Sequence, residues 1–408
     1  MKNIRNISSS NCEIAVATAV EVVESEVLTV EEYDSSGFSS SQIEQNGIVS
    51  SAPMLKRARS KRVTNTNLNE YFTPPNEEAG KQFLMRNNWP SGLQDALIKS
   101  CKKYPIRFIL VDDSGSMMTN DGHKLVKVGG SNNMKMINCT RWSESVASMQ
   151  FHAELAKALN APTEFRLLNH TNGIMVGGGP ASSEGFNKLI AALQESPSGQ
   201  TPICGHIREI TATIQEMEPS LRFAGQKACV LIVTDGEATD GDILEAMRPL
   251  QRLPVWVVVR LCTDEDKIVK YWNDLDRQLE LDIDVLDDLT GEAEEVNRAN
   301  PWLVYSDCMH RFREFGSIVK EMCVLDEAPL SSEQMRTICN LLVIGNSAAH
   351  TVPHPDEDWT GFYNLMKVNV NKHLFWDPVS KKMKPPIDMT KLSNIYCKAQ
   401  NSHSCLIS

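Results

Sequence analysis

The sequence lacks long apolar runs, paired cysteine motifs and an excess of positive charge. None of its apolar runs approaches the roughly 18 residues that a membrane-spanning helix needs, and no apolar segment follows the charged start of the chain, so we expect neither a membrane span nor secretion. The 11 cysteines are odd in number and include no C-x-x-C pair, which favours reduced thiols in an intracellular protein. A net charge of −11 argues against general nucleic-acid binding, because phosphate affinity requires a basic face.

The composition changes along the 408 residues and suggests three parts. Residues 1–82 are rich in Ser, Asn, Glu and Thr and predict a disordered arm, because they offer too little apolar surface to offset the entropy of ordering. Residues 83–320 alternate apolar strands with amphipathic helices, which predicts an α/β fold with a doubly wound, mostly parallel sheet flanked by helices. Residues 321–408 form a small C-terminal extension in which no motif indicates a chemistry.

The most informative stretch is an apolar run, 106–111, followed directly by Asp112-Asp113-Ser114-Gly115-Ser116. The run predicts a buried strand, and the residues after it form a tight glycine turn. Asp112, Ser114 and Ser116 are spaced two apart, so an extended chain leaving the sheet points all three side chains the same way. Three hard oxygen ligands at a strand end suit Mg²⁺.

Two later segments strengthen this interpretation. The run 227–234 is again an apolar strand, and it ends at Asp235 and a glycine turn. A strand that is apolar at consecutive positions is covered on both faces, as in a parallel sheet. The segment 198–202 is a loop before a helix, and it places the hydroxyl of Thr201 where a third loop reaches the same point. Taken singly, each segment also fits an ordinary turn or helix cap, in which Ser, Asp and Gly are common.

Together, in this order, the three segments resemble the von Willebrand factor type A domain over residues 83–320. The resemblance implies that the strands preceding Asp112 and Asp235 are neighbours, and that a metal-ion-dependent adhesion site holds Mg²⁺ or Mn²⁺. All five positions of that site are matched in this sequence: Asp112, Ser114, Ser116, Thr201 and Asp235. The long segment 117–140 departs from the compact loop of the family and lies beside the expected ion.

The resemblance implies a binding module that grips a protein partner presenting an Asp or Glu through the shared cation. The alternative is a Mg²⁺-dependent hydrolase of the phosphoester class that uses the same site. An enzyme needs an activated nucleophile or an acid–base pair near the metal, and no catalytic residue is assigned here. His206, soon after Thr201, is the nearest histidine in chain order, but early helix residues of this kind are more often structural or exposed.

A basic cluster in the N-terminal arm carries five cations in seven residues: Lys56, Arg57, Arg59, Lys61 and Arg62. Such a cluster is typical of a nuclear localisation signal, and a solvated tether is an equally good interpretation.

The chain ends in Cys405-Leu406-Ile407-Ser408, which matches the C-a-a-X prenylation signal, and a terminal serine favours farnesyl on Cys405. One prenyl chain anchors weakly and needs a second signal. Acylation of Cys397 or the lysines of the tail would supply it, because basic residues are attracted to an anionic leaflet. We therefore expect a cytoplasmic protein of a eukaryote, held at the cytosolic face of a membrane, with the nucleus as the alternative implied by the basic cluster.

Overall fold

The computed structural model describes residues 74–128, 134–179, 182–263, 265–345 and 352–403. All of them belong to one compact unit, Arg59–Ser408. The basic cluster and Cys405 lie outside the described residues, so the predictions made for them stay predictions.

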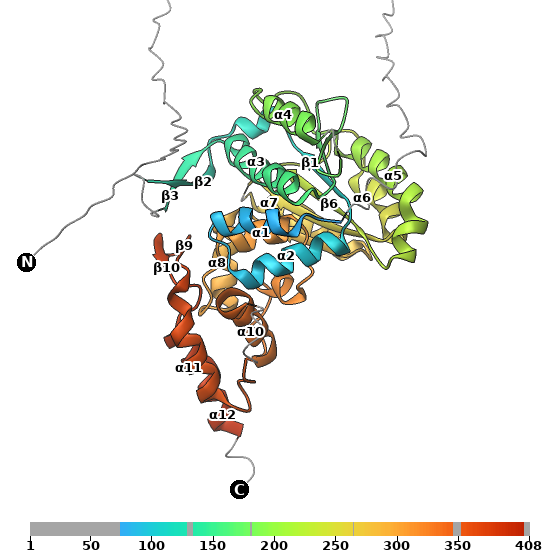
Figure 1. Cartoon of the computed structure of the whole chain (residues 1–408). Coiled ribbons are helices and arrows are strands. Elements are labelled where there is room, and N and C mark those ends of the chain that lie inside the picture. The colour runs from blue at the N-terminus through green and yellow to red at the C-terminus, as the bar shows by residue number, and fades with distance from the viewer. Residues whose placement is uncertain (1–73, 129–133, 180–181, 264, 346–351, 404–408) are drawn as a thin grey trace, which may run out of the picture. The chain divides into compact units, whose positions relative to one another are not determined.

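A six-stranded sheet forms the centre of the fold (Figure 1), in the order β5-β4-β1-β6-β7-β8. Only β5 runs antiparallel to its neighbour, β4, and the other pairings are parallel. The predicted doubly wound, mostly parallel α/β fold is therefore confirmed. The strands are β1 (Arg107–Val111), β4 (Thr163–Leu167), β5 (Ile174–Val176), β6 (Ala228–Thr234), β7 (Val255–Leu261) and β8 (Ile283–Leu286).

Helices cover both faces of the sheet, which explains why β1 and β6 are apolar at consecutive positions. On β1, Phe108 and Leu110 face one hydrophobic cluster, whereas Ile109 and Val111 face another. The first face packs against α5 (Ile203–Phe223), α6 (Ile243–Met247) and α7 (Asp266–Gln278), and the second against α3 (Arg141–Leu159) and α4 (Ser182–Leu193).

The remaining helices build a third cluster of buried side chains. Met309 and Met335 both belong to it, so side chains on either side of the predicted boundary at 320 share one core. The first helix begins six residues ahead of the boundary drawn at 83. These helices are α1 (Glu77–Arg86), α2 (Ser91–Lys103), α8 (Leu289–Ala299), α9 (Asp307–Glu314), α10 (Ser332–Cys339), α11 (Trp359–Asn369) and α12 (Met389–His403).

Two small hairpins lie outside the main sheet. The segment 117–140 contains β2 (Gly122–Lys127) paired with β3 (Met134–Cys139), and the C-terminal part contains β9 (Phe375–Asp377) paired with β10 (Lys382–Lys384). The short helical turns are η2 (Gly115–Met118), η3 (Arg248–Arg252), η4 (Lys320–Val324), η5 (Asn340–Ile344) and η6 (Val370–Lys372). In the described part of the chain, no helix combines the length and apolarity needed to cross a bilayer.

A buried network of charges joins the sheet to two helices. The carboxylate of Glu314, on α9, accepts hydrogen bonds from Ser148 (2.8 Å) and lies 2.7 Å from Nε2 of His152, both on α3. Arg311 lies 3.2 Å from the same carboxylate, and Arg260 of β7 lies 3.4 Å from it. Burial alone would raise the pKa of Glu314, but its cationic neighbours outweigh that effect and hold the pKa well below the usual range. Glu314 is therefore ionised, and it is a counter-charge for the buried Arg260 and the partly buried Arg311.

Replacing Glu314 with glutamine should cost about 3–5 kcal/mol of unfolding free energy, because Arg260 and Arg311 would keep their charge with less to balance it. Glu333→Gln is the matched control, since its carboxylate pairs with Arg336 at the surface, where ion pairs contribute only about 0–1 kcal/mol. Urea-induced unfolding measures both variants. Equal small losses in the two would contradict the role given to Glu314.

Acid should destabilise the fold through His310. Burial lowers its pKa to about 3, whereas a histidine in the unfolded chain titrates near 6.5. Below about pH 6.5 His310 binds a proton in the unfolded chain but stays neutral in the folded chain. The free energy of unfolding therefore falls as the pH drops from about 6.5 toward 3. Thermal unfolding between about pH 7 and pH 5 should show this decline, and His310→Gln should flatten it. A wild-type profile as flat as that of the variant would argue against this assignment.

Candidate functional site

Asp112 stands at the carboxyl end of β1 with its side chain fully buried. Its carboxylate accepts hydrogen bonds from the backbone N–H of Ser114 (2.9 Å) and from the hydroxyl of Thr234 (2.6 Å). Burial raises the pKa of Asp112 to about 6, and the hydrogen bonds from Thr234 and Ser114 offset only part of that effect. A buried carboxylate of this kind is stabilised by any cation that comes within reach.

A chain of side-chain contacts links the ends of β1 and β6, which pair in parallel (Figure 1). The hydroxyl oxygens of Ser114 and Ser116 lie 3.0 Å apart, and the Ser116 hydroxyl donates to Oδ1 of Asp235 at 2.8 Å. The structure thus brings together three of the predicted ligands through direct contacts. Asp112 joins them through the backbone of Ser114 and through Thr234, the residue before Asp235.

The loop that carries Thr201 packs against both strand ends. The N–H of Ser198 donates to the carbonyl of Asp113 (2.7 Å), and the N–H of Gly115 donates to the carbonyl of Gly199 (3.3 Å). Thr201 is itself buried, and its backbone N–H donates to the hydroxyl of Thr239, in the loop after β6. All three predicted segments therefore meet at one edge of the sheet.

Gly199 is required at its position in this loop. Its φ of +99° is a backbone conformation that favours glycine, and a Cβ there would lie 2.4 Å from Oδ1 of Asn169. Asn169 follows β4, and its backbone and side-chain N–H groups both donate to the carboxylate of Asp113 at 2.9 Å. Asn169 thus fixes the loop beside Asp112, a role that the sequence alone did not suggest.

Arg141 is the main site residue that sequence reasoning missed. It is the first residue of α3, is only 4% exposed, and donates to Oδ2 of Asp235 at 3.1 Å. Its guanidinium also makes a two-pronged contact with Asp121 (2.8 and 2.6 Å) and reaches Glu265 (3.0 Å). A cation is disfavoured at a helix N-terminus by the helix dipole, and this was the signal that Arg141 has partners elsewhere.

The histidines near the site have other positions than chain order suggests. His206 is buried, and its Nε2 lies 3.0 Å from the carbonyl of Leu168, so that its ring is held in the core. His170, after β4, is partly exposed at the rim, with Nε2 3.6 Å from Asp113. The structural interpretation of His206 therefore fits its surroundings.

Two oxygen separations in the cluster are ordinary hydrogen-bond lengths and also match the spacing of ligands around a small divalent cation. Neighbouring ligands of an octahedral Mg²⁺, each about 2.0–2.1 Å from the ion, lie about 2.9 Å from each other. The two separations measured along Ser114, Ser116 and Asp235 are 3.0 and 2.8 Å. Within the described residues no group of three or more His, Cys, Asp and Glu side chains is arranged to hold a metal. The candidate site is not a group of that type, because its five predicted ligands are two carboxylates and three hydroxyls.

The main sheet and the candidate site together define the class of this protein. It is a doubly wound α/β protein with a hydroxyl–carboxylate cluster at the carboxyl ends of two adjacent parallel strands, β1 and β6. No protein-family model matches the chain, and no curated protein matches it either. Among solved structures the chain is similar to the conserved hypothetical protein BatB from Bacteroides thetaiotaomicron, with 17% sequence identity and a TM-score of 0.27. The match covers 38% of this chain and 65% of BatB, so the chain spans less than two thirds of that protein, and so weak a likeness carries no argument.

Replacing Arg141 with alanine should lower the unfolding free energy by about 3–5 kcal/mol, because Asp121 and Asp235 would lose their shared counter-charge. Arg141→Lys should recover part of the loss, since lysine keeps the charge but not the two-pronged contact. The control is Arg248→Ala, which removes only an exposed pair with Glu245. Chemical denaturation gives the unfolding free energies of all three variants. If Arg141→Ala is as stable as Arg248→Ala, Arg141 does not stabilise the site through Asp121 and Asp235.

Proposed function

We propose that this chain is a metal-dependent protein-binding module of the von Willebrand factor type A kind. The observation that carries the proposal is the series of side-chain hydrogen bonds from Ser114 through Ser116 to Asp235. These hydrogen bonds link the ends of two adjacent strands through hard oxygen atoms. In doubly wound sheets, ligands bind outside the carboxyl ends of the strands, where this cluster lies.

In this proposal Asp112, Ser114 and Ser116 hold Mg²⁺ or Mn²⁺ directly, and Thr201 and Asp235 hold it directly or through water. When bound, the ion supplies a hard positive charge that favours a carboxylate oxygen from a partner's Asp or Glu. The protein's own residues set up the site: Thr234 and the Ser114 N–H orient Asp112, and Arg141 engages Oδ2 of Asp235 so that Oδ1 faces Ser116.

The hydrolase alternative gains nothing from the histidine considered for it. The Nε2 of His206 is already occupied by the carbonyl of Leu168, and the buried ring is part of the core. We therefore retain the binding module as the proposed function.

The proposed location rests on the sequence. A farnesyl group on Cys405 would hold the module at the cytosolic face of a membrane, and the cluster 56–62 would instead direct it to the nucleus. Cys397, the candidate for acylation, is a half-buried free thiol on α12.

Asp112→Asn should weaken Mg²⁺ and Mn²⁺ binding at least about 100-fold, since loss of a residue that merely supports a ligand already costs 10–100-fold. The amide keeps the volume of the carboxylate, so the fold should survive. Isothermal titration of both ions into the full chain measures the effect, with Asp266→Asn, an exposed change on α7, as the control.

Capture of partners from a lysate, with Mg²⁺ and then with a chelator, completes the test. Partners that depend on the ion should be lost from the Asp112→Asn protein and retained by Asp266→Asn. Equal ion binding by the Asp112→Asn and wild-type proteins would eliminate the metal site.

A further inference from the structure

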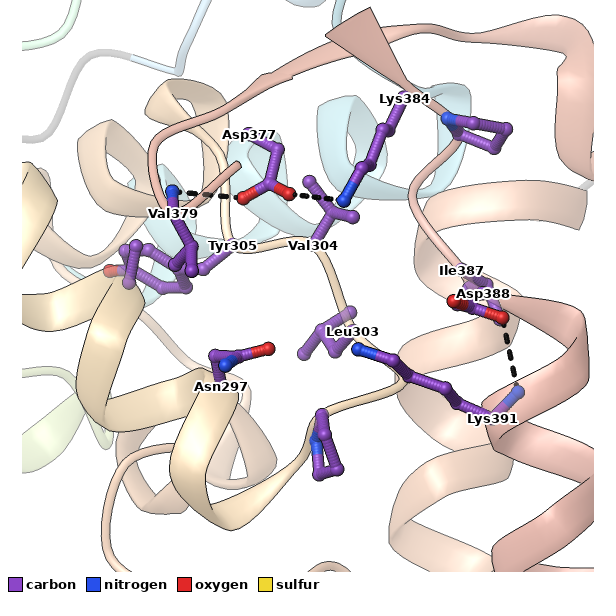
Figure 2. A pocket seen from close by; sticks show the side chains of 13 residues that line it. Asn297, Leu303, Val304, Tyr305, Asp377, Val379, Lys384, Ile387, Asp388 and Lys391 are labelled. Carbon is purple, nitrogen blue, oxygen red and sulfur yellow. Dashed lines mark hydrogen bonds and ion pairs between the residues drawn. The ribbon is translucent and has the colours of Figure 1, made fainter. Parts of the chain in front are cut away.

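A second candidate site lies in the C-terminal half of the described chain, and it shares no residue with the cluster around Asp112. It is a pocket of about 170 Å³ between α8, the segment 301–305, the β9–β10 hairpin and the first turn of α12 (Figure 2). Leu303, Val304 and Ile387 line it with buried apolar side chains, and Val379 contributes an apolar edge.

The backbone holds the walls of this pocket in place. Leu303 and Ile387 form an antiparallel bridge, and on either side of it Val304 N–H donates to the carbonyl of Pro386 (2.9 Å) and Asp388 N–H to that of Trp302 (2.8 Å). Segments more than 80 residues apart are thus joined by paired backbone. The pocket is therefore formed before any ligand arrives, which reduces the entropy that binding would cost.

Three of the four charged residues at the pocket are satisfied within the protein. Asp377 pairs with Lys384 at 2.8 Å and also accepts from Val379 N–H and the Ser380 hydroxyl, which together hold its pKa below the usual value although burial alone would raise it. Asp388 accepts from the backbone N–H groups of Thr390 and Lys391 at the start of α12.

The fourth charge is the ammonium group of Lys391, which lines the pocket and is exposed to solvent. Across the described residues no carboxylate lies within ion-pair distance of it. Figure 2 shows the Lys391 side chain extending toward Leu303, and the side-chain oxygen of Asn297, on α8, turned toward it. If the side-chain amide of Asn297 is rotated by 180°, its N–H₂ group faces Lys391 instead of its oxygen. An anion between the two side chains would then accept hydrogen bonds from both.

We propose that this pocket binds a small aliphatic carboxylate about the size of one amino-acid residue. The carboxylate would sit between Lys391 and Asn297, and the aliphatic body would cover Leu303, Val304 and Ile387. Pockets for drug-sized molecules measure roughly 300–1,000 Å³, so this smaller pocket favours a short ligand. The same chemistry is offered by a free acid and by the C-terminal residue of a peptide.

The test uses isocaproate, its uncharged amide, and a short acetylated peptide that ends in leucine with either a free or an amidated terminus. Titrated into the full chain, at least one carboxylate should bind at micromolar to millimolar concentration, and its amide at least about tenfold more weakly. Binding of isocaproate identifies a free acid as the ligand, whereas binding of the peptide alone identifies a C-terminus.

Lys391→Met should weaken carboxylate binding at least about tenfold, because it removes the cation and keeps the length of the side chain. Lys367→Met, on the exposed face of α11, is the matched control and should bind as the wild type does. Asn297→Asp places a negative charge opposite Lys391 and should weaken binding as well. The proposal is overturned if neither carboxylate binds, if amide and acid bind equally, or if Lys391→Met binds like Lys367→Met.

Discussion

The parallel pairing of β1 with β6 is the constraint on which the rest of the structure depends. Its register sets Val111, the last residue of β1, opposite Val233, so Asp112 and Thr234, the last residue of β6, lie together at the same edge. Helices cover both faces of the sheet there, and polar side chains leaving such a sheet have few routes to water. The buried members, Asp112, Ser114 and Asp235, find partners among their neighbours, and the exposed Ser116 completes the hydroxyl–carboxylate cluster.

The same need for partners explains the arginines. Arg141 ties Asp235 to Asp121 and Glu265, and thereby connects the candidate site with the segment 117–140 and with the start of α7. Deeper in the fold, Arg260 contacts Glu144 and Glu314, and Arg313 contacts Asp284 and Glu292. Buried ion pairs add little net stability when complete, but they are costly to break. The fold therefore tolerates these charges only while every partner stays in place.

The sequence predicted those features that depend on neighbouring residues. The apolar runs before Asp112 and Asp235 identified two central strands, and the order of Asp, Ser and Thr placed the candidate site at their ends. Arg141 was not found, because its partners are 20, 94 and 124 positions away, and its place at a helix start indicates only that it has partners and not which residues they are. The pocket at Lys391 was missed for the same reason. The β2–β3 pairing within the long segment 117–140 was not predicted either.

The β2–β3 hairpin within the segment 117–140 adds strand edges that are not part of the main sheet. Among the described strands β2 and β3 pair only with each other, so each has one edge outside the pair, and the backbone N–H of His123 on β2 donates to the carboxylate of Glu144. Strand edges can template association with other chains. Lysines on an edge oppose that association, since a second copy would bring like charges together. Lys124 and Lys127 on β2 and Lys135 on β3 provide this protection. These three positive charges would therefore oppose self-association through the hairpin, although Lys124 also donates to the hydroxyl of Ser143 on α3.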